Sequence, residues 1–286
     1  MEKPLIIYHG SRCLDGFGSA FAAWHYFKLT HGVEADYYPA CHGENPPDCC
    51  ERVVYMLDFS YAREQLAQLC KVATKITVLD HHQSAQQNLC GLDEEHDNLE
   101  LVFDMQRSGA VITWEHFHGT AVPTLLAHIQ DQDLWTFKLT NSKAINAALM
   151  SHPYEFELWH EFASSERALT SLMEEGQAIN RFREQMIDYY LGQTVLGSIA
   201  GFEVPIVNAP MFINSELLNR LAQAHPFAAS YADKGSRRGW SLRSVEGAAN
   251  VARIASQFGG GGHPRAAGFS TEIASDLMNI EPQKPA

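Results

Sequence analysis

The sequence predicts an α/β protein in which a parallel-sheet domain, residues 1–163, is joined by a long helix, residues 164–192, to a smaller α/β domain, residues 193–286. Two observations support this fold class. In the first half, short apolar runs rich in β-branched residues alternate with helical stretches, which is typical of a parallel sheet covered on both faces. The apolar residues of the middle segment then recur at three- and four-residue spacing up to Gly192, which favours one long amphipathic helix.

The first expected strand, Leu5–Tyr8, runs into a turn with three side chains that can bind a metal. His9, Cys13 and Asp15 lie between this strand and a helix expected to begin near Asp15. Imidazole, thiolate and carboxylate groups all bind first-row transition metals. The alternative is a glycine-rich turn in which Asp15 only caps the helix.

Two further expected strands end in ionisable side chains. One is followed by Asp58 and the other by Asp80, His81 and His82. Taken alone, two adjacent histidines are more often a solvated loop pair than part of a binding site. In an open α/β sheet, however, ligands bind at the carboxyl ends of the strands, and buried charges are costly unless they are paired. We therefore expect these residues to share one site with His9.

Two later features of the first half are candidate ligand contacts. Ser108 precedes an expected helix, so it either caps that helix or, together with Arg107, contacts a phosphate. Asp131 and Asp133 follow an apolar run and precede Trp135. They are either a surface charge pair or partly buried, and the aromatic neighbour favours burial and a ligand role for at least one of them.

Composition limits the expected partners. The chain has 21 Lys and Arg against 34 Asp and Glu, a net charge of −13, so its surface repels long double-stranded nucleic acid. A short phosphate ligand is still compatible with this charge, because bound metal ions reverse the local sign. No apolar run is long enough to span a membrane, and no signal peptide is recognisable. We expect a cytoplasmic protein with reduced cysteines and no membrane partner.

Four motifs, taken in chain order, resemble the signature motifs of the DHH phosphoesterase superfamily: His9-x-x-x-Cys13-x-Asp15, Asp58, Asp80-His81-His82 and Asp131. The family pattern opens with His-x-x-x-Asp-x-Asp, so Cys13 stands where the family usually has aspartate. The resemblance implies a site for two metals with divided roles: His9 and Cys13 on one metal, Asp58 bridging, and Asp15, His81 and Asp131 on the other. It also implies two catalytic neighbours, namely Asp80, which would orient an imidazole, and His82, which would face the substrate phosphate.

The cofactors implied are two divalent metal ions, with Mn or Fe favoured and Co or Zn as alternatives. The thiolate of Cys13 is softer than a carboxylate and shifts the preference from Mn²⁺ towards Fe²⁺, Co²⁺ or Zn²⁺. Three outcomes stay open: a dinuclear site with a cysteine ligand, a site with one strongly bound metal, or a degenerate site without catalysis. We favour a working site, because the other ligand positions are filled.

The second half resembles the DHHA1 domain that accompanies DHH domains. The matching parts are a strand at 242–244 and a glycine-rich stretch at 259–268. In the family this domain grips the nucleotide part of the substrate, which implies a set of substrate-binding residues: Arg243, Gly260, Gly261, Gly262 and His263. Backbone N–H groups of glycines can approach a phosphate closely. A plain linker is the alternative.

These features together predict a metal-dependent phosphodiesterase that hydrolyses linear dinucleotides or very short oligoribonucleotides to 5′-mononucleotides. The alternatives are a single-strand exonuclease or an inorganic pyrophosphatase of the same superfamily, or a nucleotide-binding regulator with a degenerate metal site. The oligomeric state is left open, with a homodimer as one option.

Overall fold

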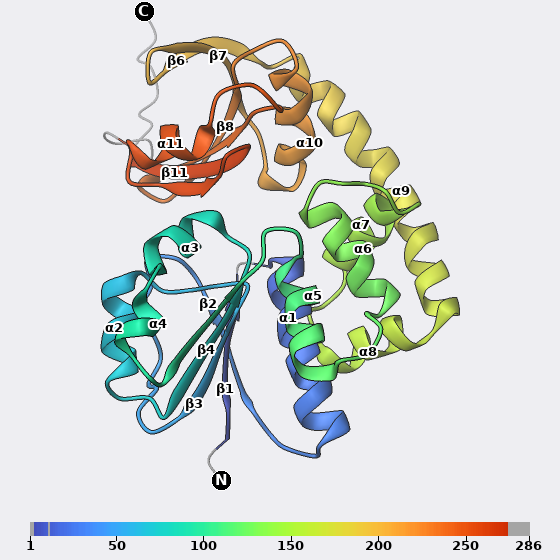
Figure 1. Ribbon diagram of the computed structural model, residues 1–286. Coiled ribbons are helices and arrows are strands. Elements are labelled where there is room, and N and C mark those ends of the chain that lie inside the picture. The colour runs from blue at the N-terminus through green and yellow to red at the C-terminus, as the bar shows by residue number, and fades with distance from the viewer. Residues whose placement is uncertain (1–2, 11, 274–286) are drawn as a thin grey trace, which may run out of the picture. The chain divides into compact units, whose positions relative to one another are not determined.

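The computed structural model describes residues 3–10 and 12–273, and the chain divides into two compact units, residues 1–182 and 183–286 (Figure 1). The fold class is the predicted one, with a parallel sheet in unit 1 and a mixed sheet in unit 2. The boundary between the units lies inside the long helix. Its first part, up to residue 182, belongs to unit 1, and the rest belongs to unit 2. No helix in the described part of the chain combines the length and the apolar character needed to cross a membrane.

Unit 1 is built on a sheet that has five parallel strands within the described residues, in the order β2-β1-β3-β4-β5. These strands are β1 (Leu5–His9), β2 (Asp36–Ala40), β3 (Val53–Leu57), β4 (Lys75–Asp80) and β5 (Leu99–Phe103). The helices of this unit follow in chain order: α1 (Leu14–Trp24) with its π-helical continuation η1 (His25–Thr30), α2 (Arg63–Cys70), α3 (Gln83–Leu89), α4 (Leu92–Glu95), α5 (Gly109–His118), α6 (Thr124–Asp133), α7 (Ser142–Ser151), α8 (Phe156–Ser164) and the first part of α9 (Glu166–Leu191).

Both faces of the parallel sheet are covered, as β1 illustrates. Ile6 packs with Ile112 of α5 on one face, while Ile7 packs with Leu66 of α2 on the other. Ile6, Ile7 and Leu66 are fully buried. Burial of one such side chain stabilises the fold by about 1.5–3 kcal/mol. Figure 1 shows α1 and α5 on one side of the sheet and α2, α3 and α4 on the other.

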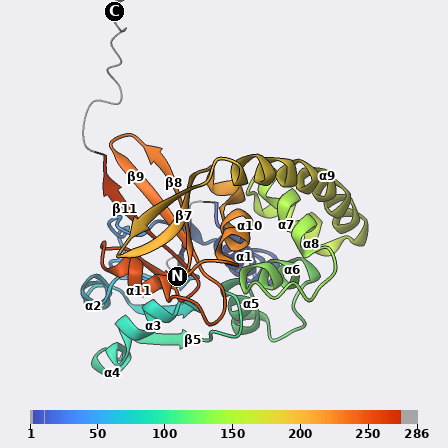
Figure 2. The same ribbon diagram turned by 90° about the horizontal axis from the view of Figure 1, so that it is seen from above.

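Helices α6, α7 and α8 form a helical layer with the first part of α9 (Figure 2). Trp159 of α8 is fully buried at its centre, and Leu172 of α9 belongs to the same apolar cluster. Gly176 of α9 lies against the backbone of Ala144 in α7, where a side chain would not fit. This close approach fixes the first part of α9 on unit 1.

Unit 2 contains a mixed sheet that has six strands within the described residues, in the order β10-β11-β9-β8-β7-β6. Its elements are β6 (Val195–Ile199), β7 (Phe202–Asn208), α10 (Met211–Ala222), β8 (Ala228–Lys234), β9 (Arg237–Arg243), α11 (Val251–Ser256), β10 (Gly261–His263) and β11 (Ala266–Glu272). Leu217 of α10 packs with Ile187 from the last part of α9, whereas Ile254 of α11 packs with Leu242 of β9 in a separate cluster.

Candidate metal centre

The sheet register of unit 1 brings three predicted site residues to one edge. Tyr8 of β1 lies opposite Leu57 of β3, and the same register continues into β4. His9, Asp58 and Asp80 therefore end three neighbouring strands side by side. This is the arrangement expected from parallel strands whose carboxyl ends meet.

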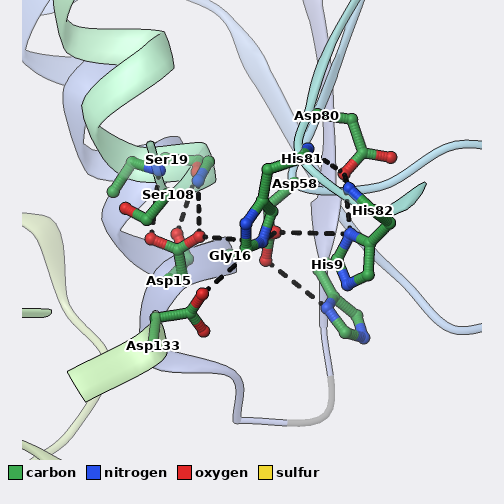
Figure 3. A network of polar contacts seen from close by, with 12 residues as sticks. His9, Asp15, Gly16, Ser19, Asp58, Asp80, His81, His82, Ser108 and Asp133 are labelled. Atoms are coloured by element: carbon green, nitrogen blue, oxygen red, sulfur yellow. Dashed lines mark hydrogen bonds and ion pairs between the residues drawn. The ribbon is translucent and has the colours of Figure 1, made fainter. Parts of the chain in front are cut away.

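Asp58 lies at the centre of the site (Figure 3). One carboxylate oxygen, Oδ1, is 3.1 Å from His81 Nε2. The other, Oδ2, is 3.4 Å from His9 Nδ1 and 3.6 Å from Cys13 Sγ. The side chain is buried, and the residue has a φ of +53°, a left-handed conformation that aspartate tolerates better than most residues.

Among the described residues, Asp58 belongs to three groups of potential metal-binding residues, one of them with Asp80 and His82, and the other two are the ligand sets of this centre. The first ligand set consists of His9, Cys13 and Asp58, and the second ligand set consists of Asp15, Asp58 and His81. Within each set the ligand atoms lie within 4.8 Å of one another. Carboxylate, imidazole and thiolate groups in this arrangement fit divalent cations, and Asp58 would be available to both ligand sets.

The electrostatics of the centre also favour bound cations. Burial and the charges of Asp58 and Asp133 raise the pKa of Asp15 and of the Cys13 thiol well above their ordinary values. Burial alone would lower the pKa of His81, but Asp58, Asp133 and Asp15 outweigh it and raise this pKa to about 10. Several acidic groups thus repel one another in a small buried volume, and a divalent cation would relieve that repulsion.

Asp15 has a second role that links it to α5. Its Oδ2 accepts a hydrogen bond from the N–H of Gly109 at 2.6 Å, and its Oδ1 accepts one from the N–H of Ala110 at 3.1 Å. Ser108 occupies the N-cap position but its hydroxyl makes no capping bond, while its N–H donates to Gln130 Oε1 at 3.0 Å. The capping role considered for Ser108 is therefore performed by Asp15.

Asp80 orients His82, and the two residues are adjacent to the ligand sets. Asp80 Oδ1 lies 2.7 Å from His82 Nδ1 and also accepts hydrogen bonds from the backbone N–H groups of His81 and His82. Burial alone would lower the pKa of His82, but Asp80 raises it to about 9. Because Nδ1 is engaged, any contact between His82 and a substrate has to be made through Nε2.

Asp131 does not reach the centre, which corrects the assignment of this residue as a metal ligand. Its buried carboxylate accepts four hydrogen bonds from the segment that follows α6. The donors and distances are Thr136 Oγ1 at 2.6 Å, Lys138 N at 2.7 Å, Leu139 N at 3.0 Å and Ser142 Oγ at 2.5 Å.

Asp133 lies beside the second ligand set instead. Its Oδ2 is 3.5 Å from His81 Nε2 (Figure 3). Residues two apart on a helix point in different directions, so Asp131 and Asp133 could not both face the same site. The resemblance assigned the ligand role to Asp131 and left the role of Asp133 open, whereas the structure places Asp133 beside His81.

Arg107 is held by acidic neighbours of its own segment. Its Nε is 2.7 Å from Asp104 Oδ2, and its guanidinium also pairs with Glu115. These ion pairs occupy the cation that the sequence suggested for a phosphate contact. The two ion pairs stabilise this segment, and a phosphate would have to compete with them for Arg107.

The predicted substrate residues of unit 2 gather in its sheet. Ala266 of β11 is paired with Arg243 of β9 on one side and with His263 of β10 on the other, so these two residues share a row. The guanidinium of Arg243 donates to Ser215 Oγ at 3.1 Å and to the carbonyl of Leu242 at 2.9 Å. Burial lowers the pKa of Arg243 to about 10, so it remains cationic at neutral pH.

The glycines before His263 are not equivalent. A Cβ on Gly260 would lie 2.6 Å from Phe269 Cβ, and a Cβ on Gly262 would lie 2.5 Å from the carbonyl oxygen of Ala266. Gly261 alone of the three has open space, with no atom within 4 Å of an added Cβ. Two of the three glycines are thus explained by the close pairing of β10 with β11.

His42 is a neighbour of the centre that the sequence did not reveal. Its ring lies 5.7 Å from that of His9 and 4.9 Å from that of Phe59, measured between centroids. The segment after β2 reads as a loop, without periodicity. The available signal was positional, since His42 follows the end of β2 as His9 ends the adjacent β1.

The fold of this chain is similar to that of a solved DHH domain, and its sequence has a viral relative. No family model matches the chain. The uncharacterized protein R106 of Acanthamoeba polyphaga mimivirus is 32% identical over 295 aligned positions, which cover 94% of this chain and 68% of that protein. The DHH domain of PF0399, a member of the s1p family of ribosomal proteins, matches with a TM-score of 0.58 and 13% identity, over 95% of this chain and 83% of that one. A pGpG-specific phosphodiesterase, PggH of Vibrio cholerae, matches with a TM-score of 0.48 and 13% identity, over 95% and 94%.

Proposed function

We propose that this chain, a relative of the mimivirus protein R106 with the fold of a DHH domain, is a DHH-type, metal-dependent phosphodiesterase that hydrolyses linear dinucleotides or very short oligoribonucleotides to 5′-mononucleotides. The observation that carries this proposal is the pair of three-residue ligand sets that share Asp58. Two divalent cations held by these residues would supply nucleophile activation and charge stabilisation for an in-line displacement at phosphorus.

The chain's own residues divide the work at the centre. His9, Cys13 and Asp58 would hold one metal ion at the first ligand set, where the thiolate favours Fe²⁺, Co²⁺ or Zn²⁺ over Mn²⁺. Asp58 is common to both sets, and Asp133 stands near enough to His81 to join the second. Each of these groups is fixed on a strand end or a helix terminus, which is the rigidity that a catalytic metal site requires.

His82 would act on the phosphate. Its pKa of about 9 makes it cationic at neutral pH, and Asp80 holds its Nδ1. From that position Nε2 would donate a hydrogen bond to a phosphoryl oxygen and stabilise the charge that develops there. Asp80 is a positioning residue in this account, since it acts through the imidazole.

Unit 2 would hold the rest of the substrate. The hydrogen bonds of Arg243 go to a hydroxyl and a carbonyl, neither of which neutralises its charge. A guanidinium in this state suits a phosphate or another anionic part of a nucleotide. The net charge of −13 favours short substrates, because a long polyanion would be repelled by the acidic surface.

The experiment is a metal analysis joined to a hydrolysis screen with Mn²⁺, Fe²⁺, Co²⁺ and Zn²⁺. The substrates are linear dinucleotides, cyclic dinucleotides, a long single-stranded RNA and pyrophosphate. We expect linear dinucleotides to give two 5′-mononucleotides, and Asp58→Asn to lower the rate by roughly 100-fold or more. Leu139→Ala, which changes an exposed apolar side chain of unit 1, is the control. Cleavage of pyrophosphate alone, or nucleotide binding without turnover under every metal, would contradict the proposal in favour of a pyrophosphatase or a regulator.

A further inference from the structure

Two aromatic side chains stand in the segment between α6 and α7, residues 134–141, which we call the aromatic loop. The rings of Trp135 and Phe137 lie 4.8 Å apart between centroids, with an interplanar angle of 73°. Trp135 is 36% exposed, whereas Trp24, Trp114 and Trp159 are buried. A large exposed ring supported by a second ring is a suitable surface for stacking with another planar group.

The backbone of the aromatic loop holds both rings in strained conformations. Trp135 has a φ of +57° and Phe137 a φ of +48°, values that bulky side chains rarely adopt. Such strain persists only where surrounding contacts impose it, and it is concentrated at ligand-binding sites. The loop therefore has a defined shape that propensity alone would not produce.

Asp131 imposes this shape. Besides the four hydrogen bonds to its carboxylate, its main-chain oxygen accepts the N–H groups of Thr136 at 2.9 Å and Phe137 at 3.2 Å. The buried carboxylate thus ties down both the middle and the end of the loop. A residue that resembled a metal ligand in the sequence is instead the anchor of the exposed aromatic pair.

The aromatic loop begins next to the metal centre. Asp133, whose carboxylate is 3.5 Å from His81, is followed two residues later by Trp135. Two residues span at most about 7 Å, so the backbone of Trp135 lies close to that of Asp133, whose carboxylate borders the second ligand set. A nucleobase attached to a phosphate at the metal centre would need an apolar side chain nearby on which to pack.

We propose that Trp135, supported by Phe137, is the stacking platform for a nucleobase next to the scissile phosphate. This inference rests on the proposed function and identifies the part of the substrate that unit 1 binds besides the phosphate. Stacking is tolerant of sequence because every base has a π face, so this contact would favour nucleotides over simple phosphoesters without selecting one base.

The kinetic test compares a dinucleotide with an analogue that lacks the base next to the scissile phosphate. Trp135→Ala should raise KM for the dinucleotide about 10- to 100-fold with little change in kcat, and change KM for the abasic analogue less than about 2-fold. Trp135→Phe should retain most of the affinity. Leu139→Ala, in the same loop and 42% exposed, is the matched control and should behave as wild type.

A binding test gives a readout that does not depend on turnover. AMP titrated into the metal-loaded protein should quench tryptophan fluorescence, and Trp135→Phe should lose most of this quenching while it still binds AMP in equilibrium dialysis. Dinucleotide hydrolysis with an unchanged KM in Trp135→Ala, or equal losses on the abasic analogue, would overturn the stacking role alone. A wild-type protein that neither cleaves dinucleotides nor binds AMP would contradict the proposed function as well.

Discussion

The carboxylate of Asp15 joins the start of α1 to the start of α5, since its Oδ2 accepts the N–H of Gly109 at 2.6 Å across 94 positions of sequence. The same oxygen is 3.7 Å from His81 Nε2. One carboxylate thus caps a helix and belongs to the second ligand set. The stability of α5 and the geometry of the metal centre are coupled through it.

Gly109→Ala should disturb the centre through this coupling. A Cβ at this position would lie 2.5 Å from Asp58 Cβ and 3.0 Å from Asp15 Oδ2, so both ligands would have to shift. We expect a loss of about 1–3 kcal/mol in the free energy of unfolding together with a lower metal content, measured by denaturant titration and elemental analysis.

Gly119→Ala, just past the other end of α5, is the control. It has a φ of +60° but no atom within 4 Å of an added Cβ, so it should cost stability through backbone strain without loss of metal. If both variants keep their full metal content, the coupling of α5 to the centre is refuted.

Cys13 should determine which metal ion the first ligand set prefers. Cys13→Asp should retain both metal ions and shift the activating metal towards Mn²⁺, because a carboxylate is a harder ligand than a thiolate. Cys13→Ala should remove one metal ion per chain and lower the rate about 10-fold or more. Cys50→Ala, at an exposed cysteine, is the control. Unchanged metal content and activity in Cys13→Ala would show that the thiolate is no ligand.

The strand-end residues of this centre could be predicted from sequence, whereas the contacts between distant elements could not. His9, Asp58 and Asp80 follow apolar runs that read as strands, and a parallel sheet places their ends together without further information. The cap that Asp15 provides depends on a helix start far along the chain. His42 had no periodic pattern around it that would mark it.

The same limit applies to the helical regions. Whether Asp131 or Asp133 faces the centre depends on how α6 is rotated about its axis, and packing decides that rotation rather than local sequence. The helix expected at 164–192 exists as α9, but its division between two units depends on which core each half joins. Leu172 belongs to a core of unit 1 and Ile187 to a core of unit 2.

Asp131 and Asp133 should give opposite phenotypes when replaced. Asp131→Ala removes the acceptor of four hydrogen bonds and should lower the free energy of unfolding by about 3 kcal/mol. Asp133→Asn should leave stability nearly unchanged, because the residue is exposed, but reduce metal affinity at the second ligand set. Both variants are studied by thermal melts and by metal titrations, and each variant is the control for the other. A loss of metal only in Asp131→Ala would reverse the assignment.

Stability should also fall in acid through Asp131. Burial alone would raise its pKa, but hydrogen bonds from Ser142, Thr136 and the backbone outweigh it and lower the pKa below its ordinary value. The unfolded chain then binds this proton more readily than the folded chain, so the stabilisation is complete above pH about 4 and is lost as the pH falls through the folded pKa. The urea midpoints of wild type and Asp131→Asn should begin to converge as the pH falls below about 4 and should approach each other further as it passes the folded pKa. A difference that is constant from pH 3 to pH 7 would contradict this.

The glycines before His263 allow structure and substrate binding to be separated. Gly260→Ala would place a Cβ 2.6 Å from Phe269 Cβ, where β10 pairs with β11. This variant should therefore lower the melting temperature of unit 2. Gly261→Ala meets no atom within 4 Å, so its melting temperature should match wild type. If the backbone at Gly261 approaches a substrate phosphate, the added methyl group should raise KM for a dinucleotide several-fold, because the close approach depends on the missing side chain. An unchanged KM in a stable Gly261→Ala protein would mean that the glycines serve only the β10–β11 hairpin, and that the anionic part of the substrate is held by side chains such as Arg243.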